Sequence, residues 1–375
     1  MIIYWSMMLW SPIVYLFYSL SNKEETMLKE YNIRQGIQKK LPISYCIAVF
    51  GYFIFWIGMR RNFGDTLAYI NAFKRMPSDF SGVLESINWD SKGPVFDLAS
   101  GLFKCFISDN YTWWLMTVAI ISGACILHTV RKYSCDFFLS SFIFIAMLTF
   151  MWMMNGIRQF VCVAILFAFC DLIKNKKFII YTLVVLLLTT VHSTVIIMIP
   201  VYFLARSKPW SKMTMVFISG IILLCLFAEP FFNGVDTMLS GTSYEGSVAQ
   251  FQEDDGVNPI RVAFYSLFPI LEFWKKDELA EYYDKYPILP ICINMSFVTA
   301  LLYLVGMVTS GILIGRFPIY CEVYNLIIIP YLLDIGFKGK EKSIVKILLI
   351  IVFIFFFLLQ TSGMGYDSEL TGTIV

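Results

Sequence analysis

Apolar runs of about 20 residues recur along this chain, and they decide what it can fold into. A helix of about 20 apolar residues is long enough to cross the roughly 30 Å hydrocarbon layer of a bilayer. The composition agrees, because 58% of the 375 residues are hydrophobic and 15% are charged, against about 25% charged residues in soluble domains. A transmembrane barrel would show alternating segments of about 10 residues instead. We therefore expect an all-α, polytopic integral membrane protein.

Two regions leave the number of crossings open. Residues 178–205 form an apolar run long enough for a short hairpin, and residues 260–274 are short for one crossing. We expect the first to cross twice and the second once. A single transmembrane domain of residues 1–375 then makes about 12 crossings, and 10 or 11 are also compatible with the sequence. Both termini are expected outside. The clear apolar spans lie near residues 2–20, 42–59, 111–130, 135–154, 157–173, 213–229, 287–306, 312–335 and 344–362.

Basic residues orient these spans, because lysines and arginines favour cytoplasmic loops. Six clusters on the expected inner side hold 20 of the 29 lysines and arginines, and His128, beside one of them, is expected to be structural. Each basic residue on the outer side has a simple explanation as a helix cap or a carboxylate partner. Together they indicate an outward-facing anion site, and arginine suits phosphate better than lysine does. They are Arg60, Arg61, Lys74, Arg75, Lys92, Lys104, Arg158, Arg261 and Arg316.

Two outer loops stand out from the apolar runs. Residues 60–110 alternate aromatic, apolar and charged side chains, which predicts one or two amphipathic helices at the membrane interface. Within them, residues 94–107 read as an interfacial or re-entrant helix. Residues 230–259 are acidic and rich in glycine and serine. This second loop is either a solvated surface loop or a mobile cover that offers carboxylates to sugar hydroxyls.

One histidine and one aspartate are the candidates for proton transfer at the outer face. His192 lies among threonines and serines at the tip of the expected hairpin. A neutral imidazole, with its ordinary pKa near 6.5, accepts a proton from an alcohol; a histidine bonded between helices is the alternative. Asp65 follows Arg60 and Arg61 and either orients them or acts as the base. Tyr69 lies one helical turn beyond Asp65, so both share a face.

Signatures of nucleotide and metal enzymes are missing from the chain. There is no P-loop, no G-x-G-x-x-G, no H-E-x-x-H and no G-x-S-x-G. The cysteines contain no C-x-x-C pair, so we expect no metal and no cofactor. A net charge of +2 without a basic aromatic tract argues against nucleic acid. Arginines with a lone histidine and aspartate fit a lipid-phosphate substrate, because activated donors on the outer side are polyprenyl phosphates and pyrophosphates.

Three segments resemble the EpsG family, Wzy-like polymerases of bacterial exopolysaccharide, capsule and O-antigen synthesis. The first is MRRNFGDTLAYINAF and the third is IGRFPIYCEVYNLIIIPYLL. The second is residues 155–204, which begin with NGIRQ and contain an HS pair inside an apolar run. The resemblance covers most of residues 50–335 and rests on the order of these motifs. Family members often carry one residue between the glycine and the aspartate, whereas Gly64 and Asp65 are adjacent here.

This resemblance implies a glycosyltransferase of the bacterial inner membrane. It would transfer a glycan from undecaprenyl pyrophosphate onto a lipid-linked repeat unit at the outer face. Its partners would be these lipid-linked oligosaccharides and membrane lipid, with a flippase or a chain-length regulator as candidate protein partners. It implies His192 or Asp65 as the catalytic base and a pyrophosphate clamp of positive charge. The implied substrate-binding residues are Arg158, Arg316, Arg60, Arg61, Gln159, Tyr69 and Arg261.

Two other functions compete with polymerisation. A flippase or exporter of lipid-linked oligosaccharide also needs buried arginines, but transporters often show repeats or paired broken helices, and the sequence shows neither. A membrane-bound acyltransferase would rest on His192 alone and needs access to acyl-CoA from the inner side. The outer position expected for His192 disfavours it.

Overall fold

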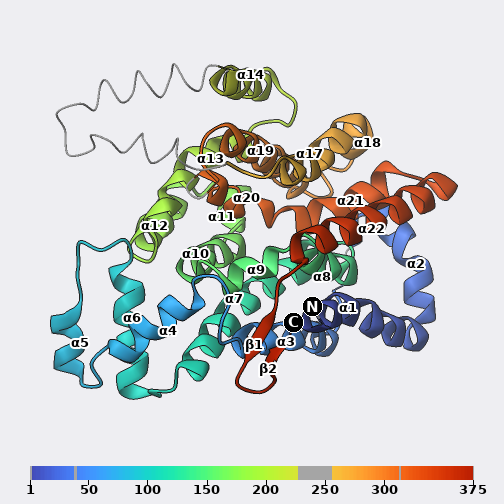
Figure 1. Ribbon diagram of the computed structural model, residues 1–375. Helices are drawn as coiled ribbons and strands as arrows, with labels where there is room; N and C mark the ends of the chain where they lie inside the picture. Colours follow the sequence, from blue (N-terminus) through green and yellow to red (C-terminus); the bar gives the residue numbers. More distant parts are fainter. Residues whose placement is uncertain (1, 38–39, 227–255, 312–313, 375) are drawn as a thin grey trace. The chain divides into compact units, whose positions relative to one another are not determined.

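Helices dominate the computed structural model, which describes residues 2–37, 40–226, 256–311 and 314–374 (Figure 1). Residue contacts divide the chain into two compact units. The first contains residues 1–199 and 329–375, and the second contains residues 200–328. The carboxylates expected in the acidic outer loop lie outside the described residues. They are Asp236, Glu245, Glu253, Asp254 and Asp255.

Membrane-spanning helices confirm the expected all-α, polytopic fold. Among the described residues, four helices are long and apolar enough to cross a bilayer, and a bent pair at residues 314–336 adds a fifth if it counts as one span. Shorter apolar helices of 10–17 residues accompany them. The four are α1 (Ile2–Ser21), α7 (Tyr111–Tyr133), α19 (Leu289–Val308) and α22 (Gly339–Thr361). The shorter ones include α3 (Ile43–Gly58), α8 (Phe137–Ala146), α10 (Ile157–Ala168), α12 (Phe178–Thr189), η1 (Ser193–Ile197) continuing into α13 (Met198–Arg206), and the apolar part of α14 (Lys212–Leu226).

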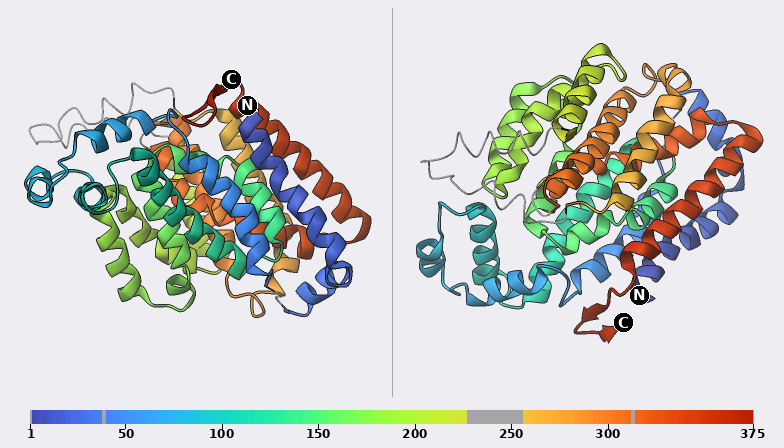
Figure 2. Two further views of the ribbon diagram at one scale, coloured as in Figure 1. Left: turned by 90° about the horizontal axis from the view of Figure 1, so that it is seen from below. Right: turned by 45° about the horizontal axis from the view of Figure 1, so that its top comes forward.

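Small residues bring α3 and α7 together in the core of the first unit, where both helices run side by side (Figure 2). A Cβ atom added at Gly123 would lie 2.4 Å from Ile54, and one at Gly58 would lie 2.6 Å from the sulfur of Met116. Glycine at such contacts lets membrane helices approach closely, and packing then holds them together. These two glycines therefore set the spacing of the α3–α7 pair.

The expected span at residues 135–154 is broken. The helix α8 ends at Ala146, and α9 (Thr149–Met154) begins after Leu148, which has a positive φ of 66°. Gly156, with φ of 70°, then turns the chain into α10. Positive φ is common for glycine but unusual for leucine. The glycine at position 156 indicates the second turn in the sequence. Nothing in the sequence indicates the turn at Leu148.

Three short helices fill residues 60–110. The first and third pack on the start of α7, and the second packs on the third. Phe73 stacks on Trp114 with ring centroids 4.9 Å apart, and Phe96 contacts the same indole edge-on. The Lys104 ammonium donates to the main-chain oxygen atoms of Phe73 and Lys74 at the end of the first of these helices. Lys104 thus has the helix-capping role that we offered for single outer basic residues. The three helices are α4 (Thr66–Arg75), α5 (Phe80–Ser86) and α6 (Pro94–Phe106).

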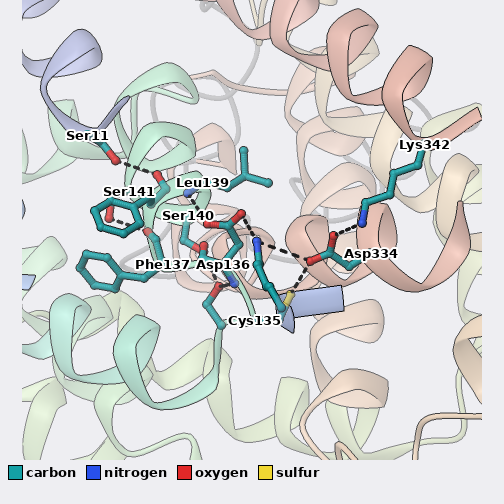
Figure 3. Close-up of polar contacts among 12 residues, drawn as sticks. Ser11, Cys135, Asp136, Phe137, Leu139, Ser140, Ser141, Asp334 and Lys342 are labelled. Carbon is teal, nitrogen blue, oxygen red and sulfur yellow. Dashed lines mark hydrogen bonds and ion pairs between the residues drawn. The ribbon is translucent and has the colours of Figure 1, made fainter. Parts of the chain in front are cut away.

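A partly buried network of ion pairs joins four helices of the first unit (Figure 3). Lys29 of α2 (Lys23–Arg34) pairs with Asp136 at the start of α8, and its Nζ lies 3.8 Å from Asp334 Oδ2 in α21 (Asn325–Gly336). Lys342 of α22 lies 2.8 Å from the other oxygen of Asp334. Asp136 also caps α8 by accepting the N–H of Leu139. Two carboxylates and two ammonium groups therefore tie N-terminal helices to C-terminal ones.

A C-terminal hairpin fastens the loop after α3, and the sequence did not lead us to expect it. The strands β1 (Tyr366–Ser368) and β2 (Gly372–Ile374) pair antiparallel, and Ser368 forms a bridge with Arg60. The Arg61 guanidinium donates to both carboxylate oxygens of Asp367, at 3.0 and 2.9 Å. The Tyr366 hydroxyl donates to the main-chain oxygen of Trp56. The hairpin thus holds the loop from which α4 starts.

Candidate functional site

The turn before α10 anchors the loop that carries Asp65. Asn155 Oδ1 accepts the Asp65 N–H at 3.0 Å. Gly64 has a φ of +48°, and a Cβ atom there would lie 2.6 Å from the same oxygen. Only glycine fits this close approach without displacing Asn155. The FGD and NGIR motifs, about 90 residues apart in the chain, are therefore in direct contact.

Arg158, in the first turn of α10, is the central cation of this region. Its guanidinium carbon lies 5.6 Å from the centre of the Tyr69 ring, within the range of a cation–π contact. The side chain is partly buried, and within the described part of the chain its Nε–H has no hydrogen-bond partner. A Cβ atom at Gly93 would lie 3.2 Å from Nη1. Arg158 is thus held in place by packing and keeps donor capacity for a ligand.

A chain of side-chain hydrogen bonds connects α10 to His192. The Nδ1 atom of His192 lies 2.9 Å from the Thr194 hydroxyl, and Gln159 Nε2 donates to that hydroxyl at 3.5 Å. Gln159 is buried, with 2% of its surface exposed. His192 directly precedes η1, so this turn presents the imidazole beside the first turn of α10. Arg158 and Gln159 are therefore placed with His192 in one region.

The start of α6 closes this region from a third side. The Val95 N–H donates to the Thr190 oxygen at 3.0 Å, and a Cβ atom at Gly93 would lie 2.5 Å from the Val191 oxygen. These contacts bring the first turn of α6 against the turn that carries His192. We name the resulting group the Arg158 site; it consists of Arg158, Gln159, His192, Tyr69 and Asp97.

Asp97 is a member of the Arg158 site that sequence reasoning missed. Burial raises the pKa of its carboxyl above the ordinary value, while the positive charge of Arg158 and a hydrogen bond from Ser91 act to lower that pKa. In the sequence, Asp97 looks like an ordinary acidic residue in the first turn of a helix, where the helix dipole favours it. Only the packing of the start of α6 beside Arg158 brings its carboxyl within reach of that positive charge.

Arg60 and Arg61 are both engaged within the protein. Arg60 has 2% of its surface exposed, and its guanidinium donates to the Thr66 hydroxyl and to the main-chain oxygens of Met154 and Ile57. Arg61 forms the carboxylate pair with Asp367 described above. These contacts give both arginines a role in holding the loop before α4.

Arg261 and Arg316 belong to the second unit, at a close-packed glycine junction. The Val257 N–H donates to the Gly306 oxygen at 3.0 Å, and a Cβ atom at Gly315 would lie 2.7 Å from the Val257 side chain. Arg261 follows this junction in the first turn of α17 (Pro259–Trp274), and Arg316 ends η2 (Ile314–Arg316) directly after Gly315. The junction therefore brings both arginines to the same end of the second unit.

A profile of the EpsG family matches residues 43–371 of this chain. The chain belongs to the EpsG family. It is therefore a multi-pass membrane protein of polysaccharide biosynthesis that resembles polymerases. No curated protein and no solved structure matches it.

The EpsG match extends beyond the segment that our motifs covered. The resemblance that we found in the sequence covers most of residues 50–335, whereas the match continues to residue 371. It thus includes α22, β1 and the turn that follows β1. The strand that contacts Arg60 and Arg61 therefore lies inside the segment that matches the EpsG family.

Gly93 offers a test of how closely α6 must pack in this EpsG-family chain. We expect Gly93→Ala to lower the free energy of unfolding by about 1–3 kcal/mol, because the added methyl overlaps the Val191 oxygen and forces α6 away. Thermal unfolding of the purified protein in detergent measures this. Gly220→Ala is the control, because nothing lies within 4 Å of the added atom. An unfolding temperature of Gly93→Ala equal to that of the control would contradict the close packing.

Proposed function

We propose that this protein polymerises a glycan at the outer face of the bacterial inner membrane. It transfers the glycan from undecaprenyl pyrophosphate onto a lipid-linked repeat unit and needs no metal or cofactor. The observation that carries this proposal is Arg158: a partly buried guanidinium over an aromatic ring, with an unused donor, next to a histidine and a carboxylate. Such a group can bind a phosphate oxygen while a neighbouring base handles a hydroxyl proton.

The leaving group needs fixed positive charge. As the acceptor oxygen attacks the anomeric carbon, the bond from that carbon to the pyrophosphate oxygen breaks, and both electrons of the bond leave with the pyrophosphate. Arg158 stabilises this developing negative charge, because its side chain is already fixed in place. Arg316 and Arg261, both at the glycine junction of the second unit, are our further candidates for binding pyrophosphate. The role of Tyr69 is to hold the Arg158 guanidinium and to present an aromatic face to a sugar.

The acceptor hydroxyl must lose its proton in the same step. We assign that proton to His192 Nε2, in the tautomer whose Nδ1–H donates to the Thr194 hydroxyl. Thr194 and Gln159 then fix the orientation of the ring, as a third group does in other base-assisted sites. Asp65 and Asp97 are the alternative bases. Asp97 lies beside Arg158, where its negative charge would oppose phosphate binding unless it carries or receives a proton.

Substitutions along this hydrogen-bonded chain test the assignment. We expect His192→Gln to lower the rate of chain extension by about 100-fold to 10,000-fold, the usual contribution of a positioned base. Thr194→Val should lower it by less, and Thr194→Ser should retain nearly the full rate because the hydroxyl remains. The rate of polymer formation from purified lipid-linked repeat units, followed against pH, is the measurement. If Asp97→Asn rather than His192→Gln removes the acid limb of the pH profile, the proton belongs to Asp97.

Lipid-linked intermediates in a strain that lacks the gene test the function itself. A polymerase leaves single repeat units on the outer face, without long chains, when it is absent. A flippase would leave the single units on the cytoplasmic leaflet, and that result would overturn our proposal in favour of transport. Addition of the purified protein to lipid-linked repeat units in vesicles should restore long chains, whereas the Arg158→Ala variant should not.

A further inference from the structure

A basic pocket lies at the end of α7 remote from the Arg158 site. It has a volume of about 340 Å³ and is lined by Lys40, Ile43, Leu127, His128, Arg131 and Lys132. No acidic residue is among these lining residues. The 23 residues of α7 rise by about 1.5 Å each, or roughly 35 Å in all, and the first turns of the helix pack on α4 and α6 near the Arg158 site. The pocket and that site therefore lie one membrane thickness apart along α7.

The cations of this pocket differ in how far the protein already uses them. Lys132 is paired with Asp171. The Nε–H of Arg131 donates to the Leu41 oxygen at 2.9 Å, and its side chain also contacts the Cys46 thiol, so the guanidinium is fixed at the edge of the pocket. Lys40 and His128 are exposed, and the described residues give neither of them a hydrogen-bond partner. The pocket thus presents the fixed guanidinium of Arg131, the exposed ammonium of Lys40 and the imidazole of His128.

An apolar stripe leads from the pocket along both helices. Ile43 and Ile47 lie one turn apart on α3 and are exposed by 47% and 58%, and on α7 Ile120 is exposed by 50%. Leu127 follows Ile120 at seven residues, on the same face of the helix, and lines the pocket. A ligand that places its phosphate among Lys40, His128 and Arg131 can therefore lay an acyl chain along this stripe. Free phosphate would bind the basic side chains without contacting the apolar stripe.

We propose that this pocket binds the headgroup of an anionic glycerophospholipid, in the leaflet opposite to the Arg158 site. The phosphate accepts hydrogen bonds from Arg131 and Lys40, and the acyl chains pack on the α3 and α7 stripe. Basic pockets between membrane helices recognise acidic lipid headgroups in this way. The lipid joins the start of α3 to the end of α7 and stabilises the folded protein by binding it and not the unfolded chain.

Lipid-dependent thermal unfolding of the full chain in detergent tests this site. Dioleoylphosphatidylglycerol should raise the unfolding temperature of the protein in a saturable way, and dioleoylphosphatidylcholine or inorganic phosphate should not. In Lys40→Gln/Arg131→Gln, half of the maximal rise should need at least about tenfold more phosphatidylglycerol, which corresponds to about 1.4 kcal/mol of binding free energy. Lys338→Gln/Lys340→Gln is the matched control, because it removes two exposed lysines outside the pocket and should titrate like the parent.

The same titration separates the alternatives. If the pocket variant and the control lose sensitivity to phosphatidylglycerol equally, acidic lipid is attracted by exposed lysines and arginines in general and not by a site. That result would overturn the proposal. A rise produced by inorganic phosphate alone would replace the lipid with a free anion, and no rise with phosphatidylglycerol would refute the site. If Lys40→Gln/Arg131→Gln fails to fold, Lys40→Gln/His128→Gln keeps the Arg131–Leu41 bond and should show a weaker but measurable shift in the titration.

Discussion

Replacing Arg158 with lysine is expected to lower the rate of chain extension by about 100-fold or more in a protein that still folds. Loss of one fixed donor to a developing negative charge costs about 100-fold to 1,000-fold in other enzymes. Lysine keeps the positive charge, but it loses the planar fork, the Nε–H and the contact of the guanidinium with Tyr69. The measurement is the rate of polymer formation from purified lipid-linked repeat units, with thermal unfolding as the check on folding.

Arg75→Lys is the matched control for this experiment. Arg75 ends α4, is exposed, and donates from Nε to the Asn71 oxygen of its own helix. It should therefore keep the parental rate within about twofold, since exposed substitutions away from a site change little. A near-parental rate for Arg158→Lys would remove the leaving-group role from Arg158. Equal losses in both variants would point to a general effect of replacing arginine by lysine, and would leave no specific role for Arg158.

Lys29→Met is expected to produce the largest loss of stability, about 2–3 kcal/mol in the free energy of unfolding. The substitution leaves Asp136 and Asp334, whose side chains are exposed by 13% and 10%, without the ammonium between them (Figure 3). Removing one partner of a fully buried ion pair costs about 3–5 kcal/mol, and we lower this figure because the Lys29 side chain is one-third exposed. Thermal or denaturant unfolding in detergent measures the change.

A double-mutant cycle separates the ion pair from simple loss of a side chain. Asp136→Asn keeps an oxygen that can cap α8 at the Leu139 N–H while it removes the negative charge. The pair Lys29→Met/Asp136→Asn should therefore lose less stability than the sum of the two single changes. Lys338→Met, an exposed lysine before α22, should change stability by at most about 0.5 kcal/mol. Strict additivity in the cycle would mean that the two side chains do not interact.

Several features of this fold follow from local sequence and were predicted. The apolar runs predicted the long helices, because hydrocarbon leaves the backbone no hydrogen-bond partners other than its own. Gly156, with a φ of 70°, marks the turn into α10 as a glycine commonly does. The alternating pattern of residues 60–110 predicted one or two amphipathic helices, and three short helices, α4 to α6, are present. Each of these properties depends on neighbours within a few turns of the chain.

The features that were missed depend on partners far away in the chain. Asp97 faces Arg158 only because α6 packs on the turn at Thr190. The C-terminal strands have three residues each, too few to show an alternating pattern. The partner of Arg61 lies 306 residues away, so a basic residue that looked available for phosphate is engaged with a carboxylate. Periodicity cannot report such pairs, because it reads only the face on which a residue lies.

The hairpin at residues 366–374 also constrains the order of synthesis. The ribosome synthesises this segment after every helix described here. The loop at residues 60–65 can therefore contact Asp367 and Ser368 only after all these helices have been synthesised. A nascent chain that stops after α22 would insert into the bilayer with its helices complete and with that loop still unfastened. Fastening of this loop is therefore coupled to synthesis of residues 366–368, and a premature stop codon near residue 365 would yield a membrane-inserted protein that lacks this contact.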